Sequence, residues 1–474
     1  MIKGLFFLLL LVILFSSIKL EKVSVTQEKL LIQEGVRFSD SKLWEAQRHY
    51  YDNAGIEKWS EQVPFYVTSN PFIADFYARI MLRMFQDWMI QHPEVRGQKF
   101  YIIELGAGTG QFSFYVLKRM RELQLQWGLS DISFCYVMTD FTASNIDFWQ
   151  SHECFQPFVD DGLLDFATYD FEQGTFIKLL RSNVTLSPGS VTTPISVIAN
   201  YLFDSIVVDF FNIEDGSIKE SLVNIEIPSQ YVKEDQVQWP KVELGFCDQD
   251  MAENYYQHAV FDQMLHNYRR SLQDTYLQFP IGGLRGLENL SNIANGKLML
   301  LSSDKGHVSL GELDDQDKPS LDFHGSFSMM ANYHAISEYF QLSGGEVCLQ
   351  ELFDAFATGV FSLGFKMEQL DHLRMELDDT IRGVCPGHYY HQYDHFDKTV
   401  NSASIEFIAS MLKYTHWDPA IFDLASDRIS ELLDGADEDV IGFITRNLSK
   451  IADNFYFLPG ADDTLFDLAV YCQE

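Results

Sequence analysis

A buried strand that leads directly into a glycine-rich turn and then a helix constrains this sequence most. The strand is expected over Lys99–Leu105 and an amphipathic helix over Gln111–Leu125. Between them the chain reads Gly106-Ala107-Gly108-Thr109-Gly110. Glycine permits a tight turn and the close approach of a ligand to the backbone, while the helix N-terminus offers free N–H groups to an anionic group. The segment therefore predicts a ligand-binding loop.

The spacing of the glycines distinguishes between cofactors. Dinucleotide-binding proteins use Gly-x-Gly-x-x-Gly, whereas this chain has Gly-x-Gly-x-Gly after Glu104, with Gln111 where the dinucleotide motif needs its last glycine. This pattern favours S-adenosylmethionine (SAM), whose methionyl carboxylate would lie at the helix N-terminus. A nucleotide or NAD site and a glycine turn without a ligand are the alternatives. The expected cofactor-binding residues of the loop are Glu104, Gly106, Ala107, Gly108, Thr109 and Gly110.

Further short apolar runs alternate with helical segments after the loop. Strands are expected over 132–139, 163–169, 195–199 and 297–302, with a long insertion between the last two at about 207–295. Short apolar strands separated by helices indicate a parallel sheet with crossover helices. The expected fold class is α/β: a Rossmann-like class I methyltransferase sheet with helices on both faces, an inserted α/β substrate region and an α-helical C-terminal module.

Polar side chains follow three of these strands. Asp140 ends the second strand, where an acid can bind the ribose hydroxyls, and Asp170 follows the third, where it can bind the adenine amino group. Asn200 and Asp204 follow the fourth strand, beside the expected methyl donor. Methyl transfer requires an aligned nucleophile and a proton acceptor, so Asn200 and Asp204 are the candidate catalytic residues. Each of the three acids could equally serve as a turn or capping residue.

Four histidines offer weaker signals. His334 stands at an expected helix start and is a candidate base, although a structural role is the simpler interpretation. His388, His391 and His395 have a spacing that could place them on one helix face, but the neighbouring Pro386 and the tyrosines are as consistent with a loop. We therefore predict no metal site.

The charge balance limits the classes of partner. The formal net charge is −34, from 34 basic and 68 acidic side chains, and no dense Lys/Arg run is present. Because nucleic-acid-binding proteins present a basic patch or stripe, binding to DNA or RNA is not expected. Acidity favours solubility and suits a basic protein substrate. The six cysteines are widely spaced without metal-ligand spacing and are expected to be reduced.

The chain divides into four predicted segments. Residues 1–20 form a hydrophobic leader, with Lys3 before an apolar run, as in a signal peptide or membrane anchor. A helical N-terminal segment is expected over 21–98, a SAM-dependent methyltransferase domain over 99–375 and a helical module over 376–474. Since SAM is a cytosolic metabolite, a cytoplasmic location is expected, with membrane association or export through the leader as the alternative.

Four segments together resemble the MidA family of SAM-dependent methyltransferases, whose relatives include the mitochondrial complex I assembly factor that methylates a protein arginine. These are Phe65-Tyr66-Val67-Thr68-Ser69-Asn70-Pro71, the loop from Glu104 to Gly110, Ala199-Asn200-Tyr201-Leu202-Phe203-Asp204-Ser205, and Leu300-Leu301-Ser302-Ser303-Asp304-Lys305-Gly306. The resemblance covers about residues 45–370. It implies a SAM-dependent enzyme that acts on a protein side chain, Arg or Lys.

The sequence departs from that family at two positions. The family's Glu after Asn is Tyr201 here, and its Asp-Tyr-Gly is Asp304-Lys305-Gly306. Tyr201 removes a carboxylate from beside the methyl donor, which puts arginine methylation in particular doubt. The competing hypothesis is a non-catalytic interaction or assembly protein with a methyltransferase fold. A third class, a dinucleotide oxidoreductase, would bind NAD(H) instead.

Overall fold

A mixed sheet forms the centre of the molecule. The computed structural model describes residues 29–62, 65–233, 236–350, 356–383, 386–435, 437–460 and 464–471. Seven strands follow the order β18-β19-β14-β7-β2-β3-β4. Their bounds are β2 Lys99–Leu105, β3 Ser133–Asp140, β4 Leu164–Thr168, β7 Ile195–Asn200, β14 Leu298–His307, β18 Glu346–Leu349 and β19 Phe356–Leu363. The short β17 (Ala331–Asn332) pairs with the carboxyl-terminal end of β14.

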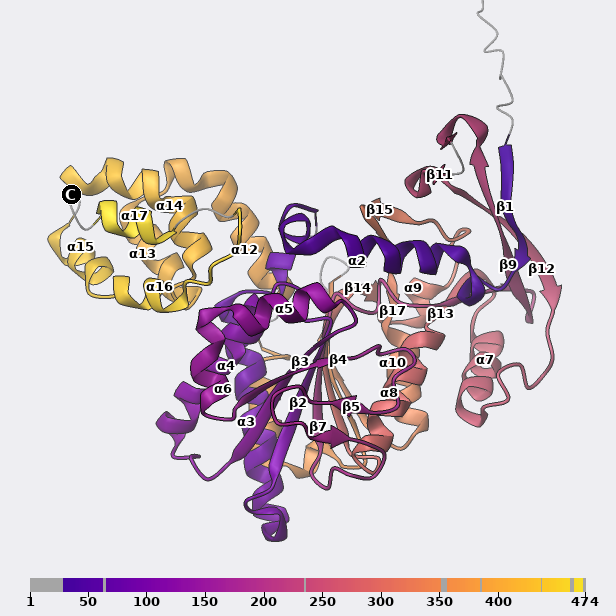
Figure 1. Ribbon diagram of the computed structural model, residues 1–474, viewed down its shortest axis with the longest axis horizontal. Helices are drawn as coiled ribbons and strands as arrows, with labels where there is room; N and C mark the ends of the chain where they lie inside the picture. The colour runs from indigo at the N-terminus through magenta and orange to yellow at the C-terminus, as the bar shows by residue number, and fades with distance from the viewer. Residues whose placement is uncertain are drawn as a thin grey trace, which may run out of the picture.

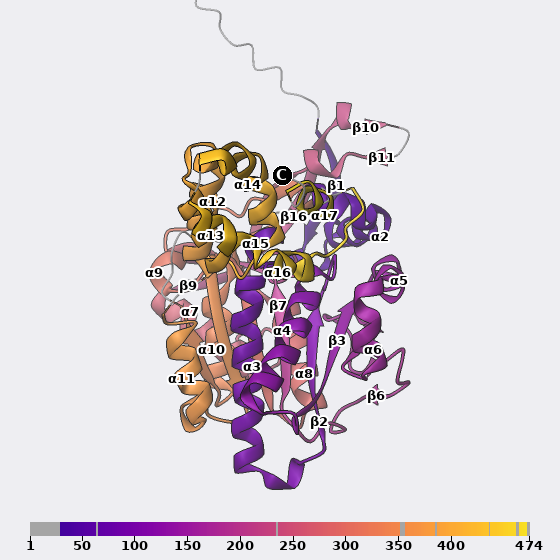
Figure 2. The same cartoon turned by 90° about the vertical axis from the view of Figure 1, so that its left-hand side faces the viewer.

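Strand direction divides the sheet into two parts. The five strands from β14 to β4 are parallel, whereas β18 and β19 form an antiparallel edge. On one face of the sheet pack α3 (Pro71–Gln91), α4 (Gln111–Trp127) and α5 (Ala143–Ser151). On the other pack α8 (Ile281–Ile293) and α10 (Tyr333–Leu342), as Figures 1 and 2 show. The predicted Rossmann-like α/β class is confirmed.

The insertion builds a second, antiparallel sheet. Strands β8 (Asp209–Glu214) and β9 (Ser217–Pro228) form a hairpin, and the turn at Asp215 and Gly216 has positive φ at both positions, as a type I′ turn requires. β12 (Glu243–Asp250) pairs with β9, and β13 (Asp274–Phe279) pairs with β8. The insertion also contains helix α7 (Ala259–Ser271).

The prediction of an all-helical segment over 21–98 is wrong at its start. Residues Lys29–Val36 form strand β1, which pairs antiparallel with β9 of the insertion. The ammonium of Lys29 pairs there with the carboxylates of Glu226 and Glu243. Adding a strand to the open edge of the second sheet satisfies backbone groups that a short separate helix would leave exposed.

Helix α2 (Lys42–Gln62) crosses the carboxyl ends of the central strands (Figure 1). Trp44 anchors its first turn, because the indole N–H donates to the carbonyl of Phe38 at 2.8 Å and the ring packs on Phe327. The amide of Gln47 donates to the carbonyl of Ser205 at 2.9 Å. The helix therefore lies over the edge of the sheet where the predicted site residues end their strands.

The C-terminal module is helical, as predicted. Its helices are α12 (Pro386–Thr399), α13 (Ile405–Tyr414), α14 (Pro419–Leu432), α15 (Glu438–Thr445), α16 (Leu448–Asn454) and α17 (Thr464–Tyr471). Residues 437–453 are divided between α15 and α16. At the end of α15, the side-chain amide of Asn447 donates to the carbonyl of Phe443. Residues 388–395, for which helix and loop stayed open, lie within α12.

The C-terminal module docks on the segment that precedes α3. The hydroxyl of Tyr66, which precedes α3, donates to the carboxylate of Asp418 at 2.8 Å and lies 2.8 Å from the hydroxyl of Tyr389. Burial raises the pKa of Asp418 to about 7.

Among the described residues, no helix is both long and apolar enough to cross a membrane. The predicted leader, residues 1–20, lies outside the described residues.

Candidate functional site

Backbone conformation at the end of β2 requires the three glycines of the loop. Gly106, Gly108 and Gly110 have φ of 60°, 53° and 80°, a region that side chains with Cβ rarely adopt. The N–H of Ala107 donates to the carbonyl of Thr139 at 3.0 Å, which ties the loop to β3. Gly110 is the N-cap of α4 and provides no side-chain cap, and the first N–H of the helix, that of Gln111, donates to the hydroxyl of Thr109 at 3.4 Å.

Two buried side chains hold this loop from behind. The indole N–H of Trp149 on α5 donates to the carbonyl of Gly108 at 3.0 Å. The hydroxyl of Tyr456, from the C-terminal module, donates to the carbonyl of Thr109 at 2.7 Å. A Cβ at Gly110 would lie 2.9 Å from that same hydroxyl. The C-terminal module is therefore in direct contact with the glycine loop, which sequence reasoning missed because 347 residues separate Thr109 from Tyr456.

Two cavities open on the front of the loop. The outer cavity holds about 870 Å³ of open space and lies under α2, against the ends of β3 and β4. The inner cavity holds about 520 Å³ and reaches from the loop to α3. Leu105, Gly106 and Tyr201 line both cavities, so these two spaces meet at the loop. An elongated ligand lying across Gly106 would fill both of them.

The inner cavity has polar walls. Its lining includes Glu104, Ala107, Thr109, Asn200, Thr68 and Ser69. The side-chain oxygen Oδ1 of Asn200 accepts from the hydroxyl of Tyr77 at 2.8 Å and from the backbone N–H of Ser303 at 3.1 Å. Its amide nitrogen is buried and has no hydrogen-bond partner among the described residues. Because an unpaired buried donor costs about 1–3 kcal/mol, this nitrogen points to a ligand with an acceptor group.

Glu104 lies at the root of the loop. One oxygen of its carboxylate accepts from the hydroxyl of Tyr136 at 2.8 Å and from that of Ser113. Burial disfavours the charged form and raises the pKa of Glu104 to about 7. The side chain is therefore close to half-ionised at neutral pH and would gain charge beside a cationic ligand group.

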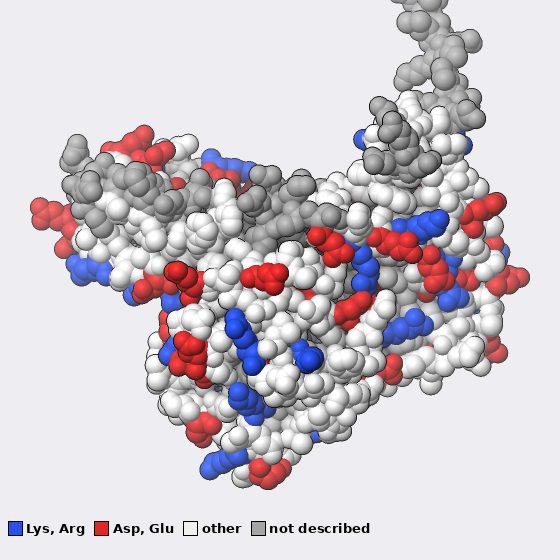
Figure 3. Space-filling model, in the orientation of Figure 1, with Lys and Arg blue, Asp and Glu red and all other residues white. Residues whose placement is uncertain are grey.

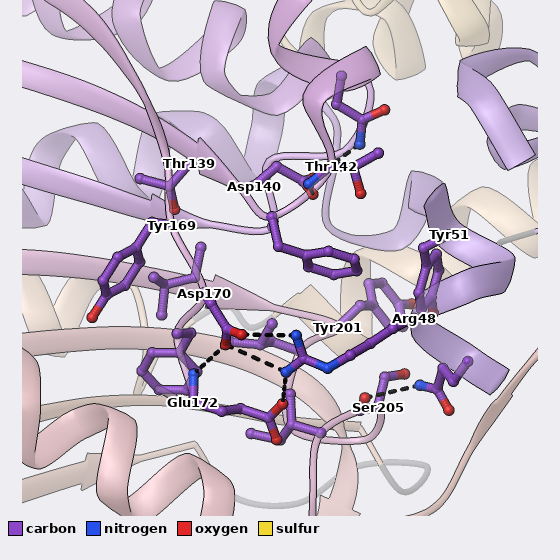
Figure 4. A pocket seen from close by; sticks show the side chains of 18 of the residues that line it. Arg48, Tyr51, Thr139, Asp140, Thr142, Tyr169, Asp170, Glu172, Tyr201 and Ser205 are labelled. Carbon is purple, nitrogen blue, oxygen red and sulfur yellow. Dashed lines mark hydrogen bonds and ion pairs between the residues drawn. The ribbon is translucent and has the colours of Figure 1, made fainter. Parts of the chain in front are cut away.

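Asp140 stands in the wall of the outer cavity, at the end of β3 (Figure 4). Its carboxylate accepts from the N–H of Thr142 and from the side-chain amide of Asn145, each at 2.9 Å. Burial raises the pKa of Asp140 despite these hydrogen bonds. Phe141 follows it, with its ring also in the lining. An acid next to an aromatic ring suits a ribose that carries a flat base.

Asp170 also lines the outer cavity, but it already has a partner. The guanidinium of Arg48 on α2 binds both oxygens of Asp170, at 2.8 and 3.3 Å, and also the carboxylate of Glu172. Figure 4 shows Arg48 reaching across the cavity to both acids. The same guanidinium lies 5.5 Å from the ring centre of Phe141. Arg48 gave no sequence signal, because its role depends on α2 crossing the sheet.

Asp204 lies apart from both cavities. Its N–H donates to the carboxylate of Asp304 at 3.0 Å and its carbonyl accepts from the N–H of Met329 at 2.9 Å. Its own carboxylate accepts from the hydroxyl of Ser205 at 2.6 Å. These bonds turn the side chain into the protein, where it is 9% exposed. Of the two predicted catalytic residues, Asn200 lines the inner cavity, whereas Asp204 is in the lining of neither cavity.

Tyr201 occupies the junction of the two cavities. Its φ of 49° lies in the left-handed region, where a bulky residue is strained, and such strain is concentrated at functional sites. Burial, followed by the nearby charges of Asp304 and Asp204, raises the pKa of its phenol, so the hydroxyl stays protonated at neutral pH. Tyr201, at which the sequence departs from the family, is thus one of the three residues that line both cavities.

The histidines lie elsewhere. His334 is at the start of α10, where its ring nitrogen Nδ1 lies 2.8 Å from the hydroxyl of Tyr268, outside both cavities. His388, His391 and His395 are on α12. Across the described part of the chain, no group of three His, Cys, Asp or Glu side chains is arranged to hold a metal ion.

Comparisons with known proteins return structures but no sequence relatives. No family model and no curated protein matches this sequence. A Burkholderia thailandensis protein bound to S-adenosyl-homocysteine aligns at 12% identity and TM-score 0.38, over 68% of this chain and 92% of its own. The DhpI–SAM–HEP complex aligns at 10% identity and TM-score 0.31, over 67% and 97%. An O-methyltransferase family protein from Burkholderia thailandensis aligns at 9% identity and TM-score 0.25, over 68% and 70%.

Proposed function

We propose that this protein is a SAM-dependent methyltransferase whose cofactor lies across the glycine loop, with the methionyl end in the inner cavity and adenosine in the outer cavity. The observation that carries the proposal is the loop itself. Three left-handed glycines lead into the start of α4 beside a polar cavity, in which the side-chain nitrogen of Asn200 has no hydrogen-bond partner among the described residues. Free N–H donors at a helix start, beside a carboxylate, suit an amino-acid group.

Each part of the cofactor has a matching group in the walls. The N–H groups at the start of α4 and the amide of Asn200 would bind the methionyl carboxylate, and Glu104 would face the ammonium. Asp140 would accept from the ribose hydroxyls, and Phe141 would contact the adenine. Asp170 would bind the adenine amino group once Arg48 has left it. The three-glycine spacing and these wall groups make SAM a better fit than a dinucleotide.

The bound cofactor would supply a methyl group on a sulfonium, ready for in-line displacement. The chain's own residues would then orient the acceptor and exclude water, with α2 covering the outer cavity and Tyr201 standing at the junction. We infer a protein side chain, Arg or Lys, as the acceptor, since the chain carries twice as many acidic as basic residues. Asn200 is the better placed catalytic candidate; Asp204 would need to turn out of its buried position.

A non-catalytic scaffold is the second candidate. It is favoured by the ion pair of Arg48 with Asp170, which occupies part of the outer cavity, and by the inward orientation of Asp204. In that case the fold would act through its helical module and the second sheet. The two candidates differ in whether methyl groups reach an acceptor.

Incubation with methyl-labelled SAM and a cell lysate tests the proposal. We expect label in the protein fraction, and none with the Gly106→Val variant, in which a β-branched side chain would stand at the junction of the cavities. Gly128→Val, with the same positive φ at the other end of α4 and open space around the added Cβ, is the matched control and should keep activity. Cofactor binding without any labelled acceptor, protein or small molecule, would favour the scaffold.

A further inference from the structure

A groove separates α4 from the C-terminal module, away from the two cofactor cavities. It holds about 1210 Å³ of open space. One wall is a face of α4, where residues recur at the three- and four-residue spacing of a helix. The other wall is the end of α13, the turn that follows it, and α16. The lining residues, which we call the α4 groove, are Pro71, Tyr115, Lys118, Arg119, Glu122, Gln126, Lys413, His416, Trp417, Lys450, Asp453 and Asn454.

The charge of this groove is opposite to that of the chain. Four basic side chains, Lys118, Arg119, Lys413 and Lys450, face two acidic ones, although the whole chain carries a net charge of −34. Acidic and basic side chains are otherwise interspersed on the face drawn in Figure 3. A local excess of positive charge in an acidic protein attracts anions into the hollow where it lies.

Two of the four cations are fixed in place by the protein. The ammonium of Lys118 donates to the side-chain oxygen of Asn454 at 2.6 Å and to the carbonyl of Asp453 at 3.0 Å. The guanidinium of Arg119 pairs with Asp75 and with Glu122. The Lys118 contacts join the two walls, and its ammonium also pairs with Glu122 at 4.0 Å.

The other two cations have no acidic partner among the described residues. The ammonium of Lys413 lies 5.8 Å from the ring centre of Phe443, and that of Lys450 lies 5.6 Å from the ring of Trp417. Those two rings are themselves 5.5 Å apart. Each of the two ammonium groups thus lies over one ring of an aromatic pair and has no carboxylate partner among the described residues. An anion in the groove would supply the negative charge that these two lysines lack.

The turn that follows α13 has an unusual backbone conformation. His416 and Trp417 have φ of 59° and 63°, two successive left-handed residues without glycine. The side-chain amide of Asn454 donates to both of their carbonyls, at 2.8 and 3.0 Å. Strain of this kind persists where the surroundings enforce it and is concentrated at ligand sites. The same Asn454 that fixes Lys118 therefore fixes the aromatic floor of the groove.

We propose that the α4 groove binds a phosphoryl group, carried either by a small molecule or by a phosphorylated side chain of a peptide. A phosphoryl dianion would match the charges of Lys413 and Lys450, the two cations of the groove without an acidic partner among the described residues, and lysine ammonium groups bind phosphate as point charges without a fixed geometry. Trp417 and His416 provide a flat surface beside the anion for the remainder of the ligand. The site is independent of the cofactor cavities and of the activity proposed for them.

Calorimetric titration of the full chain with inorganic pyrophosphate, and separately with a phosphoserine peptide and its unphosphorylated twin, tests the proposal. We expect saturable binding of one phosphoryl ligand per chain. The double variant Lys413→Gln/Lys450→Gln should bind at least about tenfold more weakly. The matched control, Lys178→Gln/Lys398→Gln, removes the same charge from exposed positions outside the groove and should stay within about twofold of the wild type.

The probes also separate the two sources of the ligand. Tighter binding of the phosphoserine peptide, with no binding of its twin, would assign the groove to a phosphorylated protein; tighter binding of pyrophosphate would assign it to a small molecule. The proposal is overturned if the wild type shows no saturable binding of either probe, or if the groove variant and the control lose affinity equally. Unchanged circular dichroism and melting temperature would show that both variants are folded.

Discussion

The inner and outer cavities are built in opposite ways around one loop. Behind the inner cavity, Trp149 and Tyr456 hold loop carbonyls through buried hydrogen bonds, and within it the amide nitrogen of Asn200 is unpaired. In the outer cavity the corresponding polar group, Asp170, is already bound by Arg48. One half is held in shape with a free donor, whereas the other must exchange a protein partner for a ligand.

This difference indicates where binding energy would come from. A preorganised site spends little free energy on ordering its side chains when the ligand binds. The methionyl end should therefore supply most of the affinity. On the outer side, breaking a charge pair offsets part of what the adenosine gains. Ligand binding there would also release α2, which Arg48 ties to the sheet edge. The changes that follow test this asymmetry, from the largest expected effect to the smallest.

Gly106→Val should have the largest effect, because Gly106 lines both cavities and has a positive φ. Left-handed backbone is costly for any β-branched residue, and the side chain would stand between the two ends of the ligand. We expect affinity for S-adenosylhomocysteine to fall by more than about 100-fold in calorimetric titration. Gly128→Val should bind like the wild type. Equal losses in both variants would mean that backbone strain at the ends of α4, and not a clash with the ligand, causes the loss of affinity.

Asp140→Ala removes the proposed ribose partner from the outer cavity. Hydrogen bonds to a charged group contribute about 1.5–3 kcal/mol, which corresponds to a loss of about 10- to 100-fold in affinity for S-adenosylhomocysteine. Asp140→Asn keeps one acceptor oxygen, although it can retain only one of the two contacts with Thr142 and Asn145, and it should lose less. If the alanine variant binds as tightly as the wild type, the ribose does not lie at Asp140.

Glu104 should make binding depend on pH. Its pKa is raised to about 7 in the folded chain by burial. A cationic ammonium favours the carboxylate, so binding releases a proton and affinity should rise as the pH increases from about 6 to 7.5, by about eightfold in total. Glu104→Gln should remove this dependence. The contrary result, affinity that falls with rising pH, would place the ammonium elsewhere.

Tyr456→Phe tests the support behind the inner cavity. The loss of one neutral hydrogen bond to Thr109 should weaken binding of S-adenosylhomocysteine by about fivefold, within the usual range for such a bond. Tyr389→Phe removes a hydroxyl that joins the C-terminal module to Tyr66, so it should lower the melting temperature and leave the affinity unchanged. A variant Tyr456→Phe with wild-type affinity and a lower melting temperature would reduce that hydroxyl to a purely structural role.

Arg48→Gln should have the smallest effect and the opposite sign. It frees Asp170 and Glu172 from their partner, so affinity for S-adenosylhomocysteine should increase by about two- to threefold, mainly because the competing ion pair is gone. Weaker binding would instead mean that Arg48 contacts the ligand, and that the outer cavity is as preorganised as the inner one.

The sequence predicted the parts of the site that are local. A strand followed by three glycines and a helix is read from adjacent residues, and Asp140 and Asn200 follow from the order of the strands. These positions reach the cavities because the carboxyl ends of parallel strands meet at one edge of a sheet. Asp204 lies outside the lining of both cavities, where its backbone bonds with Asp304 and Met329, and its catalytic role stays a prediction.

The rest depends on contacts between distant segments. Arg48 reaches Asp170 because α2 crosses the sheet, and Tyr456 reaches Thr109 because the C-terminal module folds back onto α4. Residues Lys29–Val36 form a strand because the insertion leaves an open edge beside β9. Periodicity within a segment carries no information about such partners, so neither the roof of the outer cavity nor the support of the loop had a signal in the sequence.

A crystal structure of the protein with S-adenosylhomocysteine tests the central claim most directly. The account predicts density through both cavities, with the ligand's carboxylate at the start of α4 and within hydrogen-bonding distance of the Asn200 amide, and with the guanidinium of Arg48 displaced from Asp170. Cavities that stay empty at saturating ligand, or a ligand bound away from the three glycines, would contradict it.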